Sequence, residues 1–358
     1  MENDDDKRLA QAADAALGNR NRRAVLSMDG NDMGCQFREF EKSKPDDAAK
    51  KKWMTEMSAN LRYCTRNAFC DGLIRAITLW WEEAKADADL IFSFERASTY
   101  VLPFRPLILG GDDILCLCHC SFALSMARTI IDRFEKISRE LNGDYKKNHP
   151  SSNDLWPGTS GKLTISAGIA YTGITLPLSL SIPYAENLLG SAKGKYRKEK
   201  GEKEPTPAAV DWESITETMI DSPADRRRRD LTFIDKDINT EIILTQRPFR
   251  IDPKENEITL DDVKRLKEEL EKMPRSVLTD LMTVLTLPWG ERVARLAAMA
   301  VQNPKILDWL DEGINAKEKF GSCWKIQQNG EKTIRSNWFL DALMLLEEEK
   351  RMGKETIQ

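Results

Sequence analysis

Ile108-Leu-Gly-Gly-Asp-Asp-Ile-Leu115 predicts a β-hairpin, because two apolar runs flank a tight turn made of Gly and Asp. The strand before the turn, which we place between Tyr100 and Leu109, contains prolines, and these favour an edge strand or a β-bulge. The returning strand leads into Cys116, Cys118 and Cys120, whose alternation predicts buried thiols on one strand face rather than a metal site. Gly and Asp are common in any hairpin turn, so the turn by itself does not indicate chemistry.

The rest of the chain predicts an order of helices and strands into which this hairpin fits. Ala24-Val-Leu-Ser-Met28 has the composition of a short buried strand, and apolar residues then recur at helical spacing from about Ala48 to Ala88. After the hairpin we expect a helix at 122–141, a polar loop at 142–161, a strand at 162–171, a helix from Pro183 and a last strand at 208–212. The order β-α-β-β-α-β-α-β predicts an α+β fold of the ferredoxin-like type with one added strand and helix.

We divide the chain into three parts. Residues 1–22 are expected to form a polar leader, residues 23–250 the α+β domain, and residues 251–358 an all-helical C-terminal domain. The last division rests on the helical periodicity that dominates from Leu260 to Glu349, and on prolines 248 and 253 at the boundary.

Composition excludes several classes of protein. The 358 residues include 54 Lys and Arg against 58 Asp and Glu, so a net basic nucleic-acid coat is excluded. Two His rule out chemistry built on several histidines, and seven Cys without a CxxC pair predict reduced thiols in the cytoplasm. The first residues are acidic, unlike a signal peptide, and prolines and serines in the uncharged run 163–185 argue against a membrane span.

A second acidic turn, after the first predicted strand, makes the hairpin part of a candidate metal site. Asp29 follows the first predicted strand, and in a ferredoxin-like sheet that strand lies beside the hairpin that carries Asp112 and Asp113. Clustered carboxylates repel one another and need a cation, and open oxygen sites suit two Mg²⁺ or Mn²⁺ ions that also take substrate phosphates. Gly110 and Gly111 carry no side chains, so a nucleotide can approach the backbone closely.

Two basic segments are candidates for phosphate binding. Lys193 and Arg197 are four residues apart, which predicts one face of the helix and contact with two phosphate groups. From Lys198 onward we interpret the charge run as a solvated linker. Arg226 to Arg229 predict a solvated or partner-facing loop, with contact to phosphate or RNA left open as the alternative.

Four segments in order resemble the motifs of the CRISPR polymerase palm, the cyclase palm in the large subunit of type III CRISPR effectors and a relative of GGDEF diguanylate cyclases. They are Met28-Asp-Gly-Asn-Asp-Met-Gly34, Ile108–Leu115, Ile165-Ser-Ala-Gly-Ile-Ala170 and Ala185-Glu-Asn-Leu-Leu-Gly-Ser-Ala-Lys193. Leu244–Phe249 and Lys272–Leu278 also resemble the segment that joins this palm to a helical domain, so the resemblance extends over roughly residues 23–290. No nuclease domain, zinc-binding insertion or second palm is visible, as in a stand-alone, minimal polymerase.

The resemblance implies that nucleoside triphosphates, usually ATP, are converted to cyclic oligonucleotide messengers in anti-phage signalling and that a separate effector reads them. Asp29 and Asp113 would be paired ligands of two Mg²⁺ or Mn²⁺ ions beside the Gly30 carbonyl, and Asp112 a further ligand or an orienter of the turn. Lys193, with Arg197, would hold the triphosphate, and Gly30, Gly110 and Gly111 would line the substrate. The family commonly has Asp-Gly-Asp-Asn where this chain has Asp29-Gly-Asn-Asp32, so Asp32 either takes over a metal-binding role or that role is dispensable.

Two other functions stay open. A diguanylate cyclase is disfavoured by the Asp-Asp end of the turn and by the C-terminal helical region, and a silent nucleotide-binding scaffold or sensor is disfavoured by the intact carboxylates. A ring closure needs two nucleotides face to face, and one palm is visible, so we expect a homodimer. The alternative is that residues 214–358, or another protein, supply the facing surface.

Overall fold

The computed structural model describes residues 22–86, 104–149, 154–197, 204–215, 221–252, 257–310, 323–329 and 332–350, and these fall into two compact units. One unit comprises the chain to Ile220, the short segment Arg250–Asp252 and the end of the chain from Glu349; the other comprises Asp221–Phe249 and Pro253–Glu348. The division after Ile220 comes earlier than the boundary at residue 250 that the sequence predicts. Residues 1–21 of the predicted leader and the basic run 198–203 lie outside the described residues.

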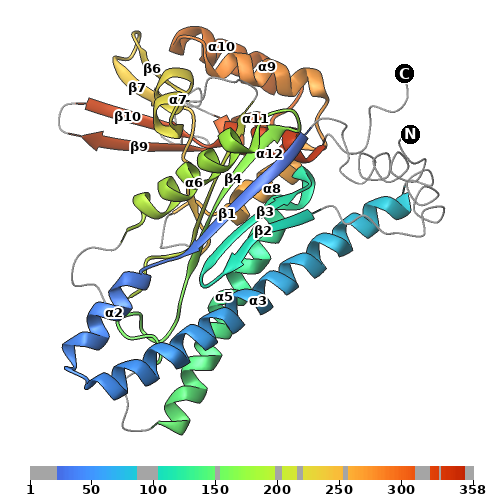
Figure 1. The fold of residues 1–358 in the computed structure, drawn as a ribbon. Coiled ribbons are helices and arrows are strands. Elements are labelled where there is room, and N and C mark those ends of the chain that lie inside the picture. Colours follow the sequence, from blue (N-terminus) through green and yellow to red (C-terminus); the bar gives the residue numbers. More distant parts are fainter. Residues whose placement is uncertain are drawn as a thin grey trace. The chain divides into compact units, whose positions relative to one another are not determined.

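A six-stranded sheet forms the centre of the first unit, with the strand order β2-β3-β1-β4-β5-β8 (Figure 1). β1 runs antiparallel to β3 and β4, whereas β4 and β5 are parallel. The part β2-β3-β1-β4 has the strand order of the ferredoxin-like fold, so the predicted α+β class is confirmed. The strands are β1 (Arg22–Gly30), β2 (Phe104–Gly110), β3 (Asp113–Cys118), β4 (Ile165–Gly173), β5 (Ala209–Ile215) and β8 (Phe249–Arg250).

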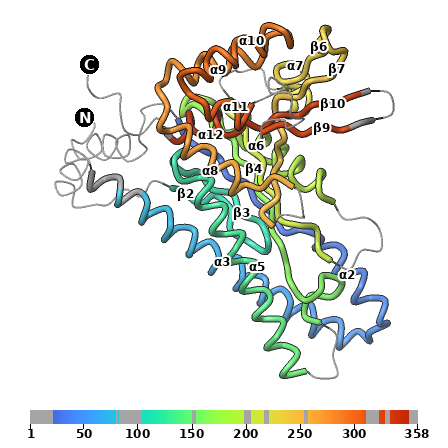
Figure 2. The backbone as a smooth tube through the Cα atoms, turned by 180° about the vertical axis from the view of Figure 1, so that it is seen from behind, coloured from blue at the N-terminus to red at the C-terminus, as the bar shows by residue number. Residues whose placement is uncertain are grey.

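The long helices α3 (Asp47–Ala86) and α5 (Cys120–Asn148) pack against each other beside the sheet (Figure 2). The Cys64 thiol of α3 donates a hydrogen bond to the Phe134 carbonyl of α5 at 3.2 Å. Gly72 permits this close packing, because a Cβ there would lie 2.5 Å from Cγ1 of Ile130.

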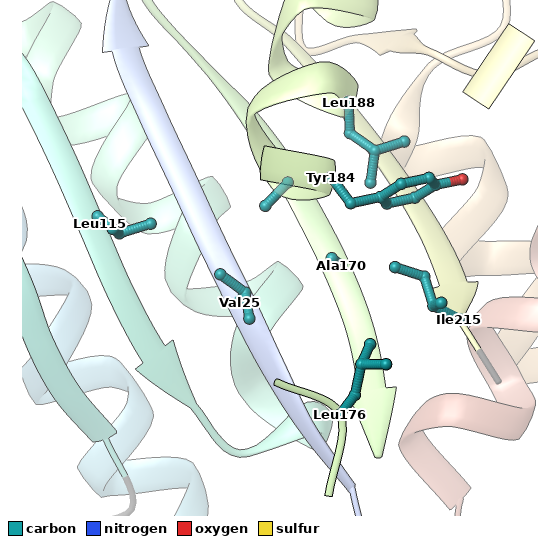
Figure 3. Close-up of a cluster of buried hydrophobic side chains, with 8 residues drawn as sticks. Val25, Leu115, Ala170, Leu176, Tyr184, Leu188 and Ile215 are labelled. Atoms are coloured by element: carbon teal, nitrogen blue, oxygen red, sulfur yellow. The ribbon is translucent and has the colours of Figure 1, made fainter. Parts of the chain in front are cut away.

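The helix α6 (Leu178–Lys195) covers the other face of the sheet. Tyr184 and Leu188 of α6 pack on Val25 of β1 and Ala170 of β4 in a buried apolar cluster (Figure 3). Because successive side chains of a strand point to opposite faces, the continuously buried run 24–28 supplies a core to both layers of helices. β1 is therefore held centrally, with its acidic end at one edge of the unit.

Several predicted boundaries need correction. α6 begins at Leu178 rather than at Pro183, because the N–H groups of Leu180 and Ser181 bond the Pro177 carbonyl and the helix continues through the proline. α5 continues to Asn148, past the predicted end at residue 141. The predicted bulge in the proline-bearing edge strand is confirmed by a register shift between Pro106 and Ile108.

The prediction that the alternating cysteines are buried is confirmed, but only Cys116 and Cys118 lie on a strand, so the expectation of one shared strand face is wrong for Cys120. Cys116 and Cys118 are buried in β3, and Cys120 is buried at the first turn of α5. Burial raises the pKa of the Cys116 thiol to about 12, so this thiol stays protonated as a core side chain.

The second unit combines helices with a sheet, which corrects the expectation of an all-helical domain. Its four-stranded sheet has the order β6-β7-β10-β9, with β7 and β10 parallel. The strands are β6 (Thr232–Asp235), β7 (Thr240–Ile243), β9 (Trp324–Asn329) and β10 (Lys332–Asn337). The helices are α7 (Pro223–Asp230), α8 (Leu260–Leu270), α9 (Arg275–Leu285), α10 (Trp289–Ala300), α11 (Lys305–Leu310) and α12 (Phe339–Lys350). Because β7 pairs with β10, the segment that carries β6 and β7 belongs to the second unit, and this unit therefore begins near Asp221.

Two buried ion pairs lie within the second unit. Arg247 bonds Asp341 at 2.8 Å and Arg292 bonds Asp235 at 3.0 Å, and all four side chains are fully buried. Thr245 also donates to Asp341, at 2.7 Å. Among the described helices of the chain, none combines the length and the apolar character needed to cross a membrane.

Candidate active site

Three carboxylates converge where β1 ends and the β2–β3 hairpin turns. The register of β1 and β3 pairs Met28 with Ile114, and this places Asp29 next to Asp113. Asp112 lies in the turn itself, and one oxygen from each of the three carboxylates lies within 4.8 Å of the others. The structure therefore brings together the acidic residues from two turns that are distant in the sequence.

The conformation of the turn aims Asp112 at the end of β1. Gly111 has a φ of 63°, in the left-handed region that favours glycine. Thr65, from α3, donates its hydroxyl to the Gly111 carbonyl at 2.7 Å and so fixes the turn from behind. A Cβ at Gly30 would lie 2.8 Å from Oδ2 of Asp112, which shows how closely this carboxylate covers the β1 backbone.

Gly110 differs from these two glycines. Apart from its chain neighbours, no described atom lies within 4 Å of the position that a Cβ would take there, and the residue is exposed. Packing among the described residues therefore gives no reason for a glycine at this position. The open backbone beside the carboxylates fits the expected close approach of a substrate.

Asp112 and Asp113 hold protons more tightly than isolated carboxylates do. Burial, the charge of Asp29 and a hydrogen bond with Asp29 together raise the pKa of Asp112 to about 7. The pKa of Asp113 is also raised, first by partial burial and then by the charge of Asp29; Lys193 opposes this rise and Glu186 adds to it. Negative charge thus exceeds positive charge at the site, and a hard divalent cation suits such a set of oxygen donors.

Lys193 is the predicted triphosphate ligand, and it belongs to this cluster. Its ammonium, from the last turn of α6, donates to Oδ2 of Asp29 in a close contact and to the Gly30 carbonyl at 2.8 Å. α6 crosses β1 because its apolar face packs on Val25 and Ala170, so its end arrives beside the end of β1.

Asp32 is not part of the cluster. Its carboxylate accepts hydrogen bonds from the backbone N–H and the hydroxyl of Thr206, at 2.7 and 3.0 Å. Asp32 has a φ of 60° and immediately precedes α2 (Met33–Lys42). Asp and Asn tolerate this left-handed conformation better than most residues.

The neighbouring Asn31 has a structural reason to be an amide. Its buried amide donates to the Thr164 hydroxyl at 3.0 Å and the Thr206 carbonyl at 3.3 Å, and it accepts from the Ser166 hydroxyl at 3.1 Å. A carboxylate could not donate these bonds, so this position requires an amide rather than an acid.

The two predictions for basic residues need correction. α6 ends at Lys195, so Arg197 lies beyond the helix and does not share a helical face with Lys193. The segment Arg226–Arg229 belongs to the helix α7 rather than to a loop, and Arg229 pairs with Asp230 at 2.8 Å.

Sequence reasoning missed Thr65 and Glu186. Glu186 precedes Lys193 by two helical turns, so a helix that already carried Lys193 at the site indicated the same face for Glu186. Thr65 lies within a long helix of ordinary composition, and no local pattern indicated its contact with the turn.

Comparison with known proteins agrees with this geometry. The chain matches the family model described as Cas10/Cmr2, second palm domain, over residues 22–201, which is half of the 358 residues. No curated protein matches the sequence. The match covers β1, the hairpin and α6, and hence the whole carboxylate cluster with Lys193. The chain is therefore a member of the Cas10/Cmr2 second-palm family and has the fold of its nucleotide polymerases and cyclases.

Proposed function

We propose that the protein is a nucleotidyltransferase that makes cyclic oligonucleotides from nucleoside triphosphates, with ATP as the favoured substrate. The observation that carries this proposal is the convergence of Asp29, Asp112 and Asp113 in a palm of this family. A scaffold that only bound nucleotides would gain nothing from three carboxylates that repel one another, as the raised pKa of Asp112 indicates.

The site residues would have distinct roles in this reaction. Asp29 and Asp113 would hold two Mg²⁺ or Mn²⁺ ions, with the Gly30 carbonyl and Asp112 beside them. Such ions lower the barrier by activating the attacking hydroxyl and stabilising the charge on the leaving pyrophosphate. A ribose hydroxyl would attack the α-phosphorus and release its proton to solvent, so that a new O–P bond forms as the bond to pyrophosphate breaks. Lys193 would bind the triphosphate, and the open backbone at Gly110 would admit it.

We further propose that two copies of the chain face each other across their Gly-Gly-Asp-Asp turns. Ring closure needs a donor and an acceptor nucleotide, and the family match covers one palm. Closed two-fold dimers are the commonest oligomers, and triphosphate with metal would bridge two acidic edges. The cyclic product would then be a messenger read by a separate effector.

The direct test is incubation of the purified protein with each of the four triphosphates and Mg²⁺ or Mn²⁺, followed by mass spectrometry. A cyclic product from ATP, absent with Asp113→Asn and present with Asp132→Asn, is expected; Asp132 is an exposed acid on α5 and serves as the matched control. No product under any combination would favour the scaffold. A cyclic product from GTP alone would favour a diguanylate cyclase.

A further inference from the structure

The contact between Lys193 and the end of β1 goes beyond phosphate binding. The Lys193 ammonium bridges two oxygens, Oδ2 of Asp29 and the carbonyl of Gly30. Both are hard oxygen acceptors, the type of ligand that a divalent cation takes. Lys193 thus occupies one oxygen of the carboxylate cluster, on Asp29, and the backbone carbonyl of the next residue.

The charges at the site give this contact a stabilising role. Three carboxylates converge there, Glu186 adds negative potential at Asp113, and Lys193 opposes it. Without a metal ion, the ammonium offsets part of the repulsion among the carboxylates. With a metal ion on Asp29, the same ammonium would add repulsion, because two cations would share one carboxylate.

The Lys193 ammonium is also able to move away from Asp29 and Gly30. Its side chain is about one-quarter exposed and has a flexible four-carbon stem, and it lies in the last turn of α6 with no described helix continuing beyond Lys195. The ammonium can therefore move without disturbing the apolar cluster of Tyr184 and Leu188, which anchors the helix earlier.

We infer that Lys193 is an internal counter-ion that holds Asp29 until a divalent cation binds, and that its release makes the ammonium available to a triphosphate. This inference rests on the proposed function for the identity of the ligands. Metal binding then increases the affinity for triphosphate, because it releases Lys193. By linkage, triphosphate that binds Lys193 increases the affinity for metal by the same factor. Lys193 thereby couples the two binding events.

The first test measures binding of Mn²⁺ alone to the full-length protein by the loss of the free-ion signal in electron paramagnetic resonance. Lys193→Met is expected to bind Mn²⁺ at least fivefold more tightly than wild type, because no ammonium competes for Asp29. Lys195→Met, which removes a charge from an exposed position in the same helical turn, should stay within twofold of wild type. Equal or weaker Mn²⁺ binding by Lys193→Met would overturn the inference.

The second test follows the lysine itself in the wild-type protein. Acylation of each lysine by a succinimidyl ester is measured by mass spectrometry with and without saturating Mg²⁺. The rate at Lys193 should rise threefold or more with Mg²⁺, while the rate at Lys195 stays constant. An unchanged rate at Lys193 would contradict release. Neither test depends on catalysis. If the protein forms cyclic product but fails both tests, only the role of Lys193 is rejected. If it passes both tests but forms no cyclic product, only the proposed function is rejected.

Discussion

Asp112 gives the metal-free protein a characteristic dependence on pH. Its pKa is raised to about 7 by burial and by Asp29, whereas an unfolded chain has an ordinary Asp value near 4. The folded protein therefore binds this proton more tightly, and stability is lost as the pH rises from about 4 through 7. We expect Asp112→Asn to flatten this fall and to raise the free energy of unfolding at pH 8 by about 1–2 kcal/mol, after allowance for solvent screening.

Urea unfolding of wild type and Asp112→Asn in EDTA, at intervals from pH 5 to pH 8, checks this expectation. Groups outside the acidic cluster are the same in both proteins, so the difference between the two curves reports the proton that the cluster holds through Asp112. Parallel curves would show that the carboxylate is ionised throughout this range.

Asp113 and Asp32 should respond differently to loss of their charge. Asp113→Asn removes an acid of the cluster and should reduce cyclic product at least a hundredfold, a barrier increase of about 2.7 kcal/mol. Asp32→Asn should keep at least a tenth of the wild-type rate but lose about 1 kcal/mol of unfolding free energy, because the carboxylate accepts two hydrogen bonds from Thr206. Product assays and urea unfolding on both variants separate the roles. A hundredfold loss of rate in Asp32→Asn, with stability unchanged, would make Asp32 a member of the catalytic cluster.

At the scale of residues, the sequence could predict the residues that carry the chemistry of the site better than the residues that hold them in position. Asp29, Asp112, Asp113 and Lys193 come together as expected, because each follows or ends an element whose place in the sheet is recognisable. The contact of Thr65 with Gly111 depends on how a long helix crosses the sheet, and no pattern within that helix records it. The pairing of Asp32 with Thr206 likewise joins segments whose proximity exists only in the folded chain.

The packing of α6 on β4 predicts opposite effects on stability when two glycines are replaced by alanine. A Cβ at Gly168 of β4 would overlap the backbone of Ala185 and Leu189, so Gly168→Ala should cost at least about 2 kcal/mol of unfolding free energy. Gly190 of α6 is exposed, with no described atom beyond its own helix backbone and chain neighbours within 4 Å of a Cβ, so Gly190→Ala should add about 0.5–1 kcal/mol through helix propensity. Thermal or urea unfolding of the two variants measures both effects. A stable Gly168→Ala protein would mean that the helix stands further from the sheet.

At the scale of elements, errors arose where two local signals competed. Pro183 predicts the first turn of a helix, yet the chain forms one more turn before it, because Pro177 offers a carbonyl and an equally good start. The strands β9 and β10 were hidden by the helical periodicity around them. Their sequence does contain Asn329-Gly330, a pair favoured in hairpin turns, and this signal could have predicted them.

For the whole molecule, mixtures of wild type with Asp113→Asn test the proposed homodimer. If each copy activates one hydroxyl in a two-nucleotide ring, mixed dimers should accumulate a linear intermediate that still carries a triphosphate. A single-site enzyme would only make proportionally less cyclic product. Mass spectrometry of the products, with sedimentation in the presence of nucleotide and Mg²⁺, distinguishes these cases. Proportional loss of product together with a monomer mass would reject the dimer.

The path of the chain through its sheet has a consequence for synthesis on the ribosome. Strands β1 to β5 are complete once Ile215 has emerged, but β5 receives its neighbour β8 only when Arg250 and Ile251 follow, the latter bonding the Ala208 carbonyl. At translation rates of about 5–20 residues per second, the edge of β5 waits some seconds without this neighbour. Unpaired strand edges invite pairing with other chains. Nascent copies on one messenger RNA are therefore most exposed to misassembly in this interval, and slow codons between residues 216 and 250 would lengthen it.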